Sequence, residues 1–189
     1  MFAEVWRSGR SGASPKPIGL RALVHWGASM QLLIGLESPA QGEVLRLLAD
    51  SDAYHARLYP AASNHLLPAT ELAGKNVRFV VARVDGRAVG CGALLIGKEG
   101  EAEIKRMFVA PRLRGRQLGR QILAALEVQA RTAGVRVLRL ETGVRQPAAL
   151  ALYRSHGYAE RGVFGVYQLD PLSTFFEKWL SCNGAPSAQ

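Results

Sequence analysis

The segment 101–141 constrains the fold more than any other part of the sequence. It contains a strand-like run at 102–110, a proline at 111, an arginine-rich turn, an amphipathic helical pattern at 117–133 and an alternating apolar and polar run at 135–141. Two strands joined by a helix form a right-handed crossover, which makes the strands parallel within one sheet. The segment therefore predicts an α/β fold with a mixed sheet.

The other predicted elements surround this unit. Val77–Val84 is rich in β-branched residues and ends at Asp85-Gly86, a dipeptide typical of a tight hairpin turn, and 88–97 is the predicted returning strand. Ser38 and Pro39 are predicted as the N-cap and first residue of a helix. The remaining predictions are a strand at 31–36, a second short helix at 50–60, a loop-rich connector at 61–75, a helix at 147–155, and strands at 162–169 and 174–180.

One domain is predicted, from Met30 to Leu180. Residues 1–29 contain several Ser, Gly and Pro residues and no sustained helical or strand period, so we expect a disordered N-terminal extension, and 181–189 is expected to be a polar tail. Two alternatives for 1–29 are that Met30 is the true start and that the segment is an Arg-rich targeting sequence. The chain has no run of about 18 apolar residues, so no membrane span is predicted.

The charge of the chain suggests nucleic acid as one partner to consider. The 24 Lys and Arg residues outnumber the 15 Asp and Glu residues, which gives a net charge of +9 and a pI of about 10.2. Six basic residues fall between Lys105 and Arg120, where a ligand bearing phosphates would account for them. The sequence also offers no aromatic platform on which bases would stack. A nucleic-acid-binding protein is therefore the weaker interpretation.

The two cysteines indicate neither a disulfide framework nor a zinc site. Cys91 and Cys182 show no CxxC spacing and have no histidine cluster beside them. No metal is therefore expected, and a reduced, cytoplasmic protein is the expectation. Cys91 lies between two glycines in a strand pattern and is interpreted as a small core residue.

The turn at 112–116 is a predicted anion site. Arg112, Arg114 and Arg116 surround Gly115 just ahead of the helix. The first N–H groups of a helix have no partner inside the helix, the helix dipole adds partial positive charge there, and arginine supplies forked donors. A strand that leads through such a turn into a helix is suited to holding phosphates.

Two motifs carry a resemblance to a known family. Arg114-Gly115-Arg116-Gln117-Leu118-Gly119 resembles the acyl-CoA-binding motif of the GNAT superfamily of N-acetyltransferases, Arg/Gln-x-x-Gly-x-Gly/Ala. Gln117 stands where the family has a glycine, and we expect it to adopt a right-handed helical conformation. The stretch 146–158 resembles the family's Asn-x-x-Ala-x-x-Leu-Tyr-x-x-x-Gly-Phe/Tyr, with Gln146 in place of Asn. The resemblance covers most of 30–180 and implies a mixed, mostly antiparallel sheet of six to seven strands flanked by helices.

The resemblance implies direct transfer of an acetyl group from acetyl-CoA to a primary amine of a small molecule, a peptide or a protein. A non-catalytic regulatory module that binds acyl-CoA is the alternative, and a homodimer is one option for its assembly. The residues implied in acetyl-CoA binding are Met107, Phe108, Val109, Arg112, Arg114, Gly115, Arg116, Gln117, Leu118, Gly119, Arg120, Gln146, Ala149 and Tyr153.

Three residues are candidates for proton transfer. The resemblance makes Tyr153 the general acid that protonates the departing thiolate; packing of its helix against the sheet is a second role. Glu103 occupies the strand position where some family members carry a general base, and Glu141, at the end of the next strand, is its rival. Glu103 could instead be solvated, or paired with Arg106 or another neighbour. The N–H of Val109 is the expected donor to the thioester oxygen.

The acceptor site is predicted over 50–75. Tyr54 and Tyr59 are the predicted substrate-binding residues, although two tyrosines at this spacing are also typical of a core face. His55 is a further candidate for the base, and His65 lies in the same segment.

Overall fold

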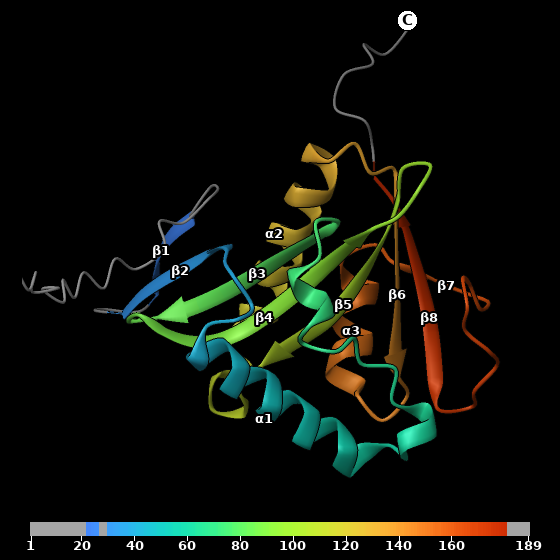
Figure 1. The fold of residues 1–189 in the computed structure, drawn as a ribbon, viewed down its shortest axis with the longest axis horizontal. Helices are drawn as coiled ribbons and strands as arrows, with labels where there is room; N and C mark the ends of the chain where they lie inside the picture. The colour runs from blue at the N-terminus through green and yellow to red at the C-terminus, as the bar shows by residue number, and fades with distance from the viewer. Residues whose placement is uncertain (1–21, 27–29, 181–189) are drawn as a thin grey trace, which may run out of the picture.

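The computed structural model describes residues 22–26 and 30–180, which form one sheet with helices on both of its faces (Figure 1). The strands are β1 (Ala22–Trp26), β2 (Met30–Leu36), β3 (Val77–Val84), β4 (Arg87–Ile96), β5 (Glu101–Val109), β6 (Val137–Gly143), β7 (Ala159–Arg161) and β8 (Ser173–Trp179). The helices are α1 (Gly42–Leu58), α2 (Leu118–Thr132) and α3 (Pro147–Ser155), with short 3-10 helices η1 (Ala61–Ser63), η2 (Glu71–Ala73) and η3 (Pro111–Leu113).

The strand order across the sheet is β1-β2-β3-β4-β5-β6-β8-β7. β5 and β6 are parallel, joined by α2 as the predicted crossover, and the other neighbouring pairs in the described part of the chain are antiparallel. The predicted fold class, a mixed and mostly antiparallel sheet flanked by helices, is confirmed. The sheet has eight strands where six to seven are predicted, because β1 pairs with β2.

The added strand lies inside the segment predicted to be a disordered extension. The prediction for 1–29 therefore does not hold for Ala22–Trp26, which pairs with 30–34 of β2. The rest of that segment, and the predicted tail at 181–189, lie outside the described residues.

α1 is a single helix, which corrects the predicted pair of helices. No glycine or proline occurs between Glu43 and Leu58, so the ladder of helical hydrogen bonds continues through Ser51. Ser38 does not cap the helix either. Its Oγ accepts the N–H of Ala40 at 3.2 Å in a local turn, and the helix begins at Gly42.

The strand predicted at 162–169 is also wrong. β7 comprises Ala159–Arg161 alone. Gly165 then takes a positive φ of 58°, and the N–H of Tyr167 donates to the carbonyl of Phe164 at 3.2 Å, which closes a turn. Positive φ favours glycine and interrupts an extended strand, so the chain leaves the sheet here and returns at β8.

Two apolar layers hold the helices to the sheet. α2 packs on one face through Ile122 and Leu126, together with α3, and α1 packs on the other through Val44 and Leu48 (Figure 1). Cys91 belongs to the α1 layer and is fully buried, and burial raises the pKa of its thiol to about 12. Cys91 is thus a core residue, as predicted, with little thiolate at neutral pH.

β5 pairs irregularly with its neighbour on each edge, and this irregularity opens a gap in the sheet. Its pairing with β6 is confined to Glu101–Ile104, after which the two parallel strands separate. On the other edge, the register with β4 shifts between Cys91 and Ala93, so that Arg106 and Met107 lie opposite Gly92 in a bulge. A gap therefore opens in the middle of the sheet.

The close approach of α2 to β4 generates a stability prediction. A Cβ atom on Gly90 would lie 2.8 Å from Ile122 Cδ1 and 3.1 Å from the Phe108 carbonyl oxygen. We expect Gly90→Ala to lower the free energy of unfolding by roughly 1–3 kcal/mol, because the core is overpacked. Urea unfolding measures this. Gly162→Ala is the matched control, since a Cβ there meets nothing within 4 Å; equal losses in the two variants would contradict the packing account.

Candidate active site

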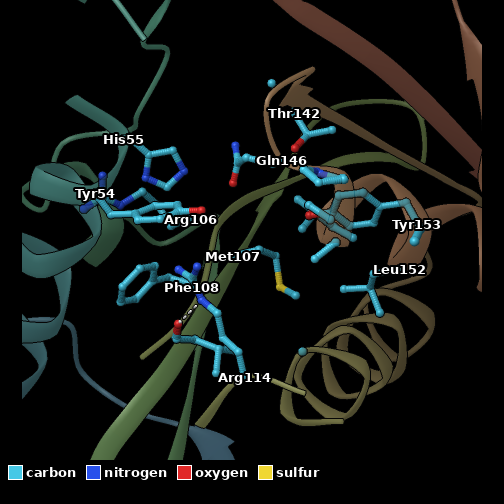
Figure 2. Close-up of a pocket in the computed structure, with 18 of the residues that line it drawn as sticks. Tyr54, His55, Arg106, Met107, Phe108, Arg114, Thr142, Gln146, Leu152 and Tyr153 are labelled. Atoms are coloured by element: carbon cyan, nitrogen blue, oxygen red, sulfur yellow. Dashed lines mark hydrogen bonds between the residues drawn. The ribbon is translucent and has the colours of Figure 1, made fainter. Parts of the chain in front are cut away.

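A cavity of about 690 Å³ occupies the gap between β5 and β6. Its walls come from α1, the loop at 63–66, the second half of β5, the turn at 113–120, the end of β6 and α3. Figure 2 shows Tyr54 and His55 on one side, Leu152 and Tyr153 on the other, and Met107 of β5 between them. Segments about 100 residues apart in sequence thus share one cavity.

Most of the residues predicted for the site line this cavity. The lining includes Met107, Phe108, Val109, Arg114, Gly115, Gln117, Leu118, Gly119, Arg120, Gln146, Ala149, Tyr153, Glu141, Tyr54 and Tyr59. Arg112 and Glu103 do not border it. Arg116 faces a separate hollow that it shares with Gly115, Gln117 and Gln121.

The end of β5 presents backbone groups to the gap. The N–H of Ala110 donates to the carbonyl of Val89 at 2.9 Å on the β4 side. Consecutive residues of an antiparallel strand direct their N–H and C=O groups to opposite edges. Those of Val109 therefore face the gap, where an extended ligand can pair with them as an added strand would.

The turn before α2 has a conformation that the sequence does not predict. Gln117 has a φ of 62° and a ψ of 8°, in the left-handed region, and precedes the helix as its N-cap residue. The expected right-handed conformation of Gln117 is therefore wrong. This geometry explains why a glycine is favoured at the position, since an L-residue is strained there. Beyond it, the N–H groups at the start of α2 point out of the helix end.

Arg114 turns inward from this loop. Its Nε donates to the carbonyl of Val109 at 3.1 Å, and its guanidinium lies 4.3 Å from the centre of the Tyr54 ring (Figure 2). Phe108 lies on the same side, at 5.7 Å. The side chain thus ties the turn to β5 and α1, so the backbone of 115–120 and Arg120 are the groups left to face an anion.

Glu141 is the carboxylate of the cavity wall. It is half-buried at the end of β6, and the Ser173 hydroxyl donates to its Oε1 at 2.6 Å. Burial raises the pKa of Glu141 above the ordinary value for a glutamate, while the Ser173 hydrogen bond and the charges of Lys105 and His65 oppose that rise. A carboxylate with a raised pKa is better matched to accepting a proton near neutral pH.

Glu103 is engaged outside the cavity. The hydroxyl of Tyr167 donates to its Oε1 at 2.5 Å, and Lys105 Nζ lies 3.1 Å from the same oxygen. Lys105 also contacts the Tyr167 hydroxyl and lies 4.7 Å from the centre of that ring. The predicted alternative in which Glu103 pairs with a neighbouring cation is the arrangement seen, with Lys105 in place of Arg106.

Tyr153 is buried on α3 and faces the cavity. Its ring packs against Tyr158 at 5.8 Å and Phe176 at 5.9 Å, measured between ring centres. Burial raises the pKa of the Tyr153 phenol, and the negative charge of Glu141 adds to the effect. The hydroxyl is therefore protonated throughout the neutral range, and the side chain both packs in the core and borders the cavity.

Tyr59 is primarily an anchor between α1 and the end of β6. Its hydroxyl accepts the N–H of Arg145 at 3.0 Å, and Arg145 Nη1 donates to the carbonyl of Leu58 at 2.7 Å. A Cβ atom on Gly143 would lie 2.0 Å from the Tyr59 hydroxyl, so glycine makes room for this contact. Tyr54 is the more open of the two predicted substrate residues.

Several lining residues were not predicted from the sequence. They include Ser63, Asn64, Leu66, Lys105, Arg106, Leu113, Thr142 and Leu152. Lys105 and Arg106 belong to the predicted strand, but the bulge that directs Arg106 toward α1 has no marker in the sequence, where glycine or asparagine would be usual.

No group of three or more metal-ligating residues, and no helix long and apolar enough to cross a bilayer, occurs in 22–26 and 30–180.

Comparison with known proteins identifies a matching family. A family model described as "Acetyltransferase (GNAT) family" matches residues 45–158. An "IAA acetyltransferase" of Azospirillum brasilense is 53% identical over 146 residues, which cover 77% of this chain and 95% of the relative. An uncharacterized N-acetyltransferase of Escherichia coli, YedL, is 32% identical over 66% of this chain and 79% of its own length.

Solved structures share the fold. A Klebsiella pneumoniae chain described as an acyl-CoA N-acyltransferase has a TM-score of 0.68 and 42% identity, over 79% of this chain and 98% of its own. The PaiA N-acetyltransferase of Thermoplasma acidophilum, solved in complex with coenzyme A, has a TM-score of 0.62 over 81% of this chain and 100% of its own. At 16% identity, the second likeness concerns the fold alone.

The left-handed Gln117 generates a prediction. We expect Gln117→Gly to raise the free energy of unfolding by up to about 1 kcal/mol, because glycine relieves the strain of positive φ. Thermal and urea unfolding measure the change. Gln121→Gly is the matched control in the right-handed interior of α2, where the same substitution lowers stability by about 1 kcal/mol. A loss of stability in both variants would contradict the conformation assigned to Gln117.

Proposed function

We propose a specific reaction for this chain, which belongs to the acetyltransferase (GNAT) family and is an N-acetyltransferase. It transfers an acetyl group from acetyl-CoA to a primary amine inside the cavity between β5 and β6. The observation that carries this proposal is the gap itself. An open strand edge, a helix N-terminus, a half-buried carboxylate and a buried phenol all face one space. The Klebsiella pneumoniae chain described as an acyl-CoA N-acyltransferase, 42% identical to this one, supports the choice of an acyl-CoA donor.

The residues of the cavity fit a long, phosphate-bearing thioester. The open edge of β5 beyond Ile104 is suited to the amides of a pantetheine arm, and the N–H groups from Gly115 to Arg120 are suited to a pyrophosphate at the start of α2. Gln146 and Ala149 of the opposite wall would border the arm. Acetyl-CoA supplies an acyl group whose carbonyl carbon accepts the lone pair of an amine.

We assign the general base to Glu141 in preference to Glu103. An alkyl amine with a pKa near 10, like that of lysine, is protonated in neutral water, so it has to lose a proton before it attacks. Glu141 lines the cavity and has a raised pKa, whereas Glu103 is bound to Tyr167 and Lys105 outside it. The ammonium releases this first proton to solvent, and Glu141 takes a second proton from the amine nitrogen as the new C–N bond forms, which leaves a neutral amide nitrogen.

Tyr153 is assigned as the general acid. Its hydroxyl gives its proton to the sulfur as the C–S bond breaks, which leaves a neutral thiol and an amide product. The burial that raises the pKa of Tyr153 keeps the proton in place until the thiolate develops. The N–H of Val109 is placed to stabilise negative charge on the carbonyl oxygen during the transfer.

The acceptor side of the cavity favours a cationic amine. The two cations there are each paired with a carboxylate: Lys105 Nζ is 3.1 Å from Glu103, and Arg106 Nη1 is 2.5 Å from Asp52. In the described part of the chain, Glu141 has no such ion pair. Its charge is therefore available to attract an ammonium group.

Release of CoA in the presence of a panel of primary amines tests the function and the choice of base. We expect Glu141→Gln to lower kcat by roughly 100-fold or more, the scale of general-base catalysis, and Glu103→Gln to have a much smaller effect. The pH profile of wild-type kcat should have an acidic limb, because protonation of Glu141 removes the base. Since the pKa of Glu141 is raised, this limb should lie at a higher pH than the pKa of an ordinary glutamate. The acidic limb should be absent from the profile of Glu141→Gln.

No amine-dependent release of CoA by the wild type would defeat the proposed function. A loss in Glu103→Gln that equals or exceeds the loss in Glu141→Gln would defeat the assignment of the base.

Tyr153→Phe tests the general acid separately. The ring contacts with Tyr158 and Phe176 are kept in this variant, so the fold and the affinity for CoA should change little. We expect kcat to fall by about 100-fold, because only the proton donor is lost. Calorimetry with CoA and steady-state kinetics measure the two quantities, and Tyr158→Phe is the matched control. Wild-type turnover in Tyr153→Phe would restrict Tyr153 to packing.

A further inference from the structure

Arg106 has an unusual backbone conformation in the middle of β5. Its φ is 56°, in the left-handed region, although the residue is not glycine. It belongs to the bulge in which Arg106 and Met107 share the place opposite Gly92. Such a conformation is unfavourable for an L-residue and persists only where surrounding contacts hold it.

The bulge decides which helix Arg106 faces. In an unbroken strand, Arg106 would share a face with Ile104, which packs in the apolar layer beneath α2. The extra residue reverses the alternation, so that Met107 packs in that layer and Arg106 is directed toward α1. Without the bulge, the Arg106 guanidinium would point into the apolar layer beneath α2. The direction of the side chain and the bulge therefore depend on each other.

An ion pair holds Arg106 in this position. Its side chain is only 2% exposed, and Nη1 lies 2.5 Å from Asp52 Oδ1 of α1. Nη2 points to the carbonyl of Leu48 at 3.4 Å, while Nε is buried with no hydrogen-bond partner among the described residues. A buried guanidinium with an unsatisfied donor makes its remaining partners important, and Asp52 is the carboxylate that compensates its charge.

The same pair joins the two sides of the cavity. Residues 104–109 of β5 form one wall, and Tyr54 and His55, which follow Asp52 on α1, form the facing wall. The pairing of β5 with β6 ends at Ile104, two residues before the bulge. A contact between Arg106 and Asp52 thus fixes both the path of the open edge and its distance from the acceptor wall.

We propose that Arg106 and Asp52 are positioning residues, whose ion pair holds the β5 bulge and α1 in the arrangement that aligns an acceptor amine with the acetyl group. This inference rests on the proposed function and deepens it. Neither residue is required to touch the reacting atoms. The pair acts by keeping the backbone of Met107–Val109 and the rings of Tyr54 and His55 in fixed relative positions.

Asp52→Asn is the test, because it removes the charge and keeps the shape of the side chain. Asp52 is 55% exposed, so the variant is expected to fold. We expect kcat to fall between about tenfold and 100-fold, the effect of a small misplacement of reacting groups. Affinity for CoA, measured by calorimetry, should change little because the N-terminus of α2 is intact. Amide hydrogen exchange in β5 over 105–109 should become faster in the protein without ligand.

Glu43→Gln is the matched control at the other end of α1. Glu43 is 48% exposed and lies 2.7 Å from Arg83 Nη1 of β3, so it forms a helix-to-sheet ion pair away from the cavity, where Arg83 is also paired with Glu37 at 2.9 Å. This variant should keep wild-type kcat and leave exchange in 105–109 unchanged. Asp52→Glu, which restores a carboxylate, should recover most of the lost activity.

The possible results separate this proposal from the proposed function. Unchanged exchange in 105–109 of Asp52→Asn, or equal losses of kcat in Asp52→Asn and Glu43→Gln, would overturn the positioning role. Absence of amine-dependent CoA release by the wild type would defeat the proposed function instead, and the exchange measurement would still show whether Asp52 holds the bulge.

Discussion

The separation of two parallel strands is the constraint on which the rest of the molecule depends. β5 and β6 pair only as far as Ile104 and Leu140, although both strands continue. Backbone N–H and C=O groups inside a protein need hydrogen-bond partners, so the groups on an edge left open in the middle of a sheet have to bond to side chains, to water or to a ligand. The Arg114 side chain donates to one such group, the Val109 carbonyl. The surrounding elements then form the walls of a cavity around the remaining edge.

Much of the fold could be predicted because its signals are local. The hairpin at Asp85-Gly86 and the crossover through α2 follow from turn chemistry and hydrophobic period, and both are present. The errors arose where local signals were weak or misleading. Ser38 and Pro39 resemble a helix start but form a turn, because α1 begins at Gly42 and then continues without a breaker. The apolar residues after Gly162 resemble a strand, yet Gly165 takes a positive φ and bends the chain.

The candidate site was predictable in its backbone parts and less so in its side chains. The arginine-rich turn and Tyr153 lie at the cavity because their motif fixes their position on a strand, a turn and a helix. The choice between Glu103 and Glu141 depends on contacts across the sheet, with Tyr167 for one and Ser173 for the other, which no local pattern encodes. The bulge at Arg106 is equally hard to predict, since the partner of Arg106 is Asp52, 54 positions away in the sequence.

We propose above all that the gap between β5 and β6 is the acetyl-CoA site, with Glu141 and Tyr153 at the thioester. A crystal structure of the protein with bound CoA tests this claim most directly. It should show the pantetheine arm along the open edge of β5, the phosphates at the N-terminus of α2, and the sulfur in the cavity near Tyr153 and Glu141. A CoA molecule bound outside the gap, or a sulfur atom nearer to Glu103 than to Glu141, would contradict it.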